Sequence, residues 1–143
     1  MKLQKISISV SKGSMMLELA LVLPLLLLLI AGIVQFGFIL NAKIAVNSAS
    51  YEGARAATLS EDPQAAAIDA VESYAGSSLP GWRMGDRLKI KIDAADNLPG
   101  TPVSVEVSYS VPVFFKNIIS FSGYESSMLD IRGASVMRVE EKE

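Results

Sequence analysis

The run of residues 19–40 constrains the fold of this chain most. It is apolar for 22 residues, with interruptions only at Pro24, two glycines and Gln35. As an α-helix it would measure about 33 Å, enough to cross the hydrocarbon core of a bilayer. Its Leu, Ile, Val and Phe residues contribute roughly −5 to −9 kcal/mol to insertion, which exceeds the cost of about 2.5 to 3.5 kcal/mol for one acidic residue. We therefore predict a transmembrane helix over residues 14–40, with Glu18 tolerated near its start.

The charge distribution predicts the orientation of this helix. Lys2, Lys5 and Lys12 precede Ser14 without any acidic residue, whereas the rest of the chain holds 10 basic and 15 acidic residues. Basic residues before a membrane helix favour a cytoplasmic N-terminus. We expect a single-pass protein of the inner (cytoplasmic) membrane whose residues 41–143 form one small domain, periplasmic or extracellular. Its acidic charge argues against nucleic acid as a partner.

Cysteine and histidine are both absent from the sequence. The usual structural zinc sites, disulfides and Cys–His nucleophilic pairs therefore cannot form, and the commonest general base is missing. Serines are plentiful, but no base is placed to activate one, and no glycine-rich phosphate loop occurs. We predict no catalytic residue, metal, cofactor or small-molecule substrate.

Glu18 is an ionisable residue at the edge of a membrane helix, which makes it a functional candidate. One alternative is that its side chain extends to the lipid headgroups, near Lys12. For the N-terminal segment as a whole, an ordinary signal peptide is the alternative, with a small-residue cleavage site near residues 48–50. The apolar run exceeds the usual 7–15 residues of a signal core, however, and an acid in it is atypical.

Residues 13–18, Gly-Ser-Met-Met-Leu-Glu, resemble the processing site of type IV prepilin-like proteins. The resemblance implies that a membrane-embedded aspartyl prepilin peptidase removes the basic leader, residues 1–13, on the cytoplasmic side. Glycine suits the cleaved position because it lets the backbone approach a protease without a side chain in the way. Cleavage between Gly13 and Ser14 would create an α-amino group about one helical turn from Glu18. Glu18 could then pair within its chain, or with Ser14 of a neighbouring subunit and so set the stagger between helices.

Two longer segments carry a more specific resemblance, L-V-L-P-L-L-L-L-L-I-A-G-I-V-Q-F-G (21–37) and A-S-Y-E-G-A-R-A-A (49–57). They resemble the TadE-like family of minor pseudopilins, which serve the tight-adherence (Tad) branch of type IV pili in surface adhesion. The matching residues are Pro24, Glu52, Gly53, Ala54 and Arg55; the chain departs from the family at Gln35, where an acidic residue is frequent. The resemblance implies as partners the prepilin peptidase, other Tad pilins or pseudopilins and the inner-membrane assembly platform.

Beyond Leu40 the helix is expected to continue out of the membrane. Small residues recur there at steps of three and four, which places them along one helix face, at Ala42, Ala45, Ala49, Gly53 and Ala56. Such a seam permits close packing, either against the protein's own sheet or against a neighbouring subunit.

The remaining pattern predicts an α+β domain. Asp62-Pro63 indicates the start of a second, short helix that Gly76 and the serines after it end. Alternating apolar residues then predict about three antiparallel strands, from residue 88, over 103–111 and over 128–139, with a bulge at Gly133. Residues 111–124 are expected to close the core, with a partner contact or a rest on the membrane surface as alternatives.

The leading hypothesis is a minor pseudopilin that takes part in Tad pilus assembly. A pseudopilin of another type IV-like system, including type II secretion, is the nearest alternative. An uncleaved single-pass membrane adaptor with an exported binding domain is an alternative of a different class, and a membrane-tethered hydrolase comes last. Retention of residues 1–13 would favour the adaptor.

Overall fold

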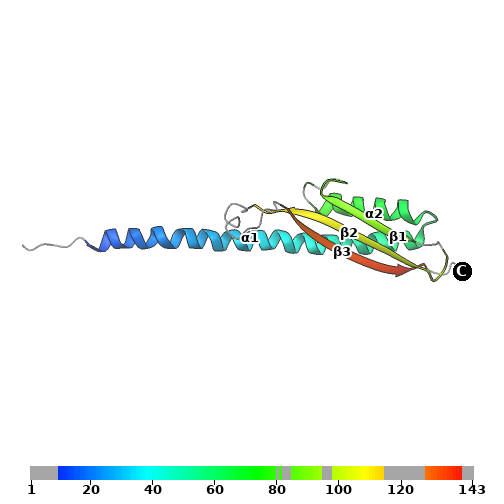
Figure 1. Cartoon of the computed structure of the whole chain (residues 1–143), viewed down its shortest axis with the longest axis horizontal. Coiled ribbons are helices and arrows are strands. Elements are labelled where there is room, and N and C mark those ends of the chain that lie inside the picture. The colour runs from blue at the N-terminus through cyan, green and yellow to red at the C-terminus, as the bar shows by residue number, and fades with distance from the viewer. Residues whose placement is uncertain (1–9, 80, 82–84, 95–97, 115–127, 140–143) are drawn as a thin grey trace, which may run out of the picture. The chain divides into compact units, whose positions relative to one another are not determined.

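A computed structural model describes residues 10–79, 81, 85–94, 98–114 and 128–139 (Figure 1). Within these ranges, two helices precede three strands: α1 (Val10–Leu59), α2 (Pro63–Ser78), β1 (Leu88–Ala94), β2 (Pro102–Pro112) and β3 (Met128–Arg138). The predicted α+β class, with a long N-terminal helix, a short second helix and a three-stranded antiparallel sheet, is confirmed. The chain divides into two compact units, Met1–Gln35 and Phe36–Glu143, which are described separately.

In the first unit, the described residues form one continuous helix that presents apolar side chains on all sides. Leu17, Leu21 and Leu25 are 68%, 71% and 70% exposed, and other large apolar side chains around them are exposed as well. Exposing so large an apolar surface to water is unfavourable. Exposed apolar patches of this extent mark contacts with a membrane or with another protein. Within α1, the stretch from Gly13 onward has the length and composition of a membrane span.

Pro24 lies inside α1 without ending it. Proline has no N–H group, so the carbonyl of Ala20, four residues earlier, loses its usual helical donor. Membrane helices tolerate such a residue where neighbouring groups or small backbone adjustments satisfy the freed carbonyl.

The sheet of the second unit has the order β1-β2-β3, and both pairs are antiparallel. Its register keeps all inward apolar residues on one face, since Ile90 lies opposite Val107 and Ile92 opposite Val105. In the pairing of β2 with β3, Tyr109 lies opposite Ile131 and Val103 lies opposite Met137, on the same inward face. The predicted alternation is therefore the alternation of buried and exposed side chains in the sheet.

The C-terminal part of α1 and α2 cover the inner face of this sheet. α1 contributes Val46, Ala49 and Ala57 to the core, and α2 contributes residues spaced by four, namely Ala67, Val71 and Ala75. The core is thus made mainly of valine on the sheet and alanine on the helices, which lets two helices lie close to one small sheet.

α2 begins at Asp62-Pro63 and ends at the serines after Gly76, as predicted. The Asp62 carboxylate accepts a hydrogen bond from the Ala65 amide at 3.1 Å, and Pro63 occupies the first helical turn. The helix continues through Gly76 to Ser78 and closes with the Leu79 amide donating to the Ala75 carbonyl. Leu79, which caps the helix, is buried in the core.

The predicted bulge at Gly133 is wrong. Gly133 pairs with Val107 in an unbroken register along β3. A Cβ atom there would lie 3.0 Å from both the Val46 carbonyl carbon and the Asn47 amide nitrogen. Glycine is needed at this position because the α1 backbone approaches the strand. Close approach of another backbone, like a bulge, is a common reason for glycine inside a strand.

Candidate processing and assembly site

Gly13 and Ser14 lie in the first turns of α1 and are exposed. A Cβ added to Gly13 would meet no atom within 4 Å, so the fold of this chain does not itself require glycine there. Glycine lowers helix stability by about 1 kcal/mol relative to alanine, and helix ends open most easily. A protease that binds extended backbone would therefore find its easiest entry at this end of α1.

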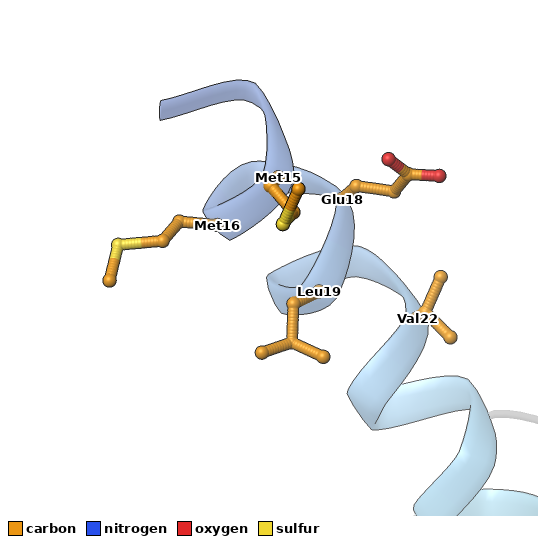
Figure 2. Close-up of a pocket in the computed structure, with 5 residues that line it drawn as sticks. All are labelled: Met15, Met16, Glu18, Leu19 and Val22. Carbon is orange, nitrogen blue, oxygen red and sulfur yellow. The ribbon is translucent and has the colours of Figure 1, made fainter. Parts of the chain in front are cut away.

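Glu18 projects from α1 into apolar surroundings. Figure 2 shows its carboxylate and Val22 extending to the same side of the helix, whereas Met16 extends to the opposite side. Glu18 shares an open hollow on the helix surface with Met15, Met16, Leu19 and Val22. All five residues come from this one helix, so the hollow does not enclose a ligand.

The Glu18 carboxylate has no hydrogen bond or ion pair within the described part of the chain. Ser14, one turn before it, still carries a peptide nitrogen while residues 1–13 are attached, so no cation is available there in the full-length chain. A carboxylate in hydrocarbon is costly unless it meets a positive charge. Among the described residues, the Glu18 carboxylate is thus an acceptor without a positively charged partner.

The seam of small residues is buried over most of its length. Ala42, Ala45, Ala49 and Gly53 are buried, whereas Ala56 is only half-buried. The face continues instead through Ala54 and Ala57, both fully buried. At Gly53 an added Cβ would lie 2.6 Å from Val71 Cγ2 and 3.3 Å from Val105 Cγ1. The protein's own α2 and sheet therefore occupy this face.

The family-motif residues of the second segment divide between surface and core. Glu52 and Arg55 lie 3.9 Å apart as a solvent-exposed pair, which contributes only a few tenths of a kcal/mol. Gly53 and Ala54 point inward and set how closely α1 approaches α2 and β2. The motif therefore combines a packing dipeptide with flanking charges.

Two contacts hold the C-terminal part of α1 to the rest of the second unit, and neither is visible in the sequence. The Lys43 Nζ donates a hydrogen bond to the Arg132 carbonyl of β3. The Phe38 and Phe114 rings pack with centroids 5.2 Å apart. These pairs are separated by more than 70 residues, so local patterns could not have joined them. Residues 115–124 of the segment predicted to close the core lie outside the described residues.

Within the described ranges, no group of three or more acidic residues is placed to hold a metal ion. The same residues contain no buried side-chain polar atom without a hydrogen bond. In the described part of the second unit, every buried side-chain polar atom therefore has a hydrogen-bond partner.

Residues 13–55 match the family described as TadE-like protein. The match starts at the expected processing glycine and ends at Arg55, and it confirms the resemblance that the motifs predicted over this part of the chain. No curated protein and no solved structure matches the chain.

Proposed function

Since residues 13–55 are TadE-like, and TadE-like proteins are associated with the Tad pilus, we propose that this chain is a minor pseudopilin of that system. A prepilin peptidase cleaves it after Gly13 on the cytoplasmic side and leaves Ser14 as the new N-terminus. The cleaved chain spans the membrane through the apolar part of α1, with residues 41–143 outside the cytoplasm. There it takes part in pilus assembly for surface adhesion, as a structural subunit and not as an enzyme.

The observation that carries this proposal is the position of Glu18. Its carboxylate stands among exposed methionine, leucine and valine side chains on a helix with the composition of a membrane span. Cleavage after Gly13 would create an α-amino group with an ordinary pKa of about 7.7 to 8.0, hence largely protonated near neutral pH. A protein that makes this cation by proteolysis has a reason to retain the acid.

Pairing between chains gives the acid an assembly role. When Glu18 of one chain meets the Ser14 amine of another, both charges are neutralised at one relative height of the two helices. Any other height leaves both charges unpaired in hydrocarbon, and that penalty selects the correct stagger. The other Tad subunits and the membrane assembly platform are the partners in this process.

The test is Glu18→Ala, with Leu21→Ala as a control of similar depth that removes no charge. We expect Glu18→Ala to be cleaved but to co-isolate with partner pilins in much lower amounts than wild type. The control should assemble normally, because Leu21 is an exposed apolar residue without a charge. Unchanged co-isolation of Glu18→Ala would refute the charge-register role.

A further inference from the structure

The outer face of the sheet, turned away from the helices, carries a cluster of positive charge. Lys89 lies opposite Ser108, which in turn lies opposite Arg132, and in the adjacent row Lys91 lies opposite Glu106. These side chains surround a shallow hollow of about 250 Å³. Three cations and one carboxylate line this hollow, and two further acids of the same face flank it, Asp93 beside Lys91 and Asp130 beside Arg132.

Only one of these cations has an ion-pair partner among the described residues. The Arg132 guanidinium lies 4.0 Å from the Glu106 carboxylate. Lys89 and Lys91 are exposed and make no ion pair within the described ranges. The cluster, named here the basic sheet face (Lys89, Lys91 and Arg132), thus presents to a partner two ammonium groups that form no ion pair with a described residue.

The opposite side of the same unit carries negative charge. α2 packs on the inner face of the sheet through Val71, and its sequence contains two acids, Asp69 and Glu72, but no basic residue. Asp69 is exposed, Glu72 is half-buried, and neither forms an ion pair with a described residue. These two residues are named here the acidic helix face.

We propose that the basic sheet face of one copy binds the acidic helix face of a second copy. The inference rests on the proposed function, because membrane helices that assemble side by side bring such domains together. The two faces point in opposite directions from one unit, so the contact is heterologous and can repeat from copy to copy. A repeating head-to-tail contact suits an open assembly.

The spacing of the charges fits this contact. Lys89 and Lys91 are two residues apart on one side of a strand, about 7 Å, and Asp69 and Glu72 are neighbours on a helix, about 5–6 Å apart. Each exposed ion pair is weak in water, but complementary charge sets orientation and register. Confinement to a membrane raises the effective concentration of the partners, so weak pairs suffice.

Disulfide cross-linking of the full-length chain tests the contact, since the sequence has no cysteine of its own. Asp69→Cys in one tagged copy and Lys91→Cys in a differently tagged copy are co-expressed with the prepilin peptidase and oxidised in membranes. We expect a mixed disulfide at least about tenfold above the Asp69→Cys and Leu98→Cys pair, because proximity dominates the yield. Leu98 is exposed and lies outside both faces.

A charge exchange separates electrostatic docking from chance encounter. Adding Lys89→Glu to the Lys91→Cys copy should lower the yield about threefold or more, and adding Glu72→Lys to the Asp69→Cys copy should restore it. A yield equal to the Leu98→Cys control, or no recovery on exchange, would overturn the contact. The mass of the same chains reports leader removal, so the proposed function is judged separately: a retained leader contradicts that function whatever the cross-link shows.

Discussion

Gly133 determines how closely α1 approaches the sheet. The distances from an added Cβ to Val46 and Asn47 backbone atoms leave no room for a side chain unless the helix moves. Its neighbour Ala134 points to the exposed outer face, so the two residues differ in surroundings while sharing a strand. This difference provides a matched pair of substitutions.

We predict that Gly133→Val lowers the free energy of unfolding by about 1–3 kcal/mol, the usual cost of overpacking. Ala134→Val should be nearly neutral, because valine is accepted on an exposed strand face. Chemical unfolding of the full chain in detergent micelles, followed by circular dichroism, measures both. Equal effects of the two substitutions would show that the α1 backbone does not approach β3 closely.

Among the elements, α2 has the most clearly defined boundary. The Asp62 side chain caps its first turn through the Ala65 amide. We predict that Asp62→Ala costs about 1 kcal/mol of stability, whereas Asp62→Asn, which keeps an acceptor oxygen, costs much less. The same unfolding measurement compares them. A loss as large for asparagine as for alanine would indicate that the carboxylate charge, and not the cap, matters.

The sequence predicted the elements well where their signals were local. Asp62-Pro63 located the start of α2, and the alternation around Val105 and Ile90 located the strands. Contacts across the chain were missed. Steps of three and four fit both Ala56 and Ala57, and only packing against α2 and the sheet selects Ala57. Gly133 showed no local sign that a helix backbone approaches it, so a bulge was the nearest interpretation.

The candidate processing and assembly site remains a prediction from the sequence. Gly13, Ser14 and Glu18 were identified by spacing and resemblance, and the structure adds that Glu18 has no partner among the described residues. The basic sheet face was not found, because Lys89 and Arg132 come together only through the register of three strands. Alternation predicted that these side chains point outward, but strand order decided which of them are neighbours.

At the scale of the whole molecule, one helix serves two environments. Up to Val34 its large apolar side chains are exposed and suit lipid, whereas Phe38 packs on Phe114 and, from Ala42 onward, small residues pack in the core of the second unit. Under the proposed function, Glu18 gains a matching cation only after the basic leader, residues 1–13, has been removed.

The most direct measurement is the intact mass of the chain isolated from membranes of cells that contain a prepilin peptidase, with a peptidase-free strain as the control. We expect a chain that has lost residues 1–13 and starts at Ser14 in the first strain, and a full-length chain in the second. A chain that still begins at Met1 beside an active peptidase would contradict the proposed function.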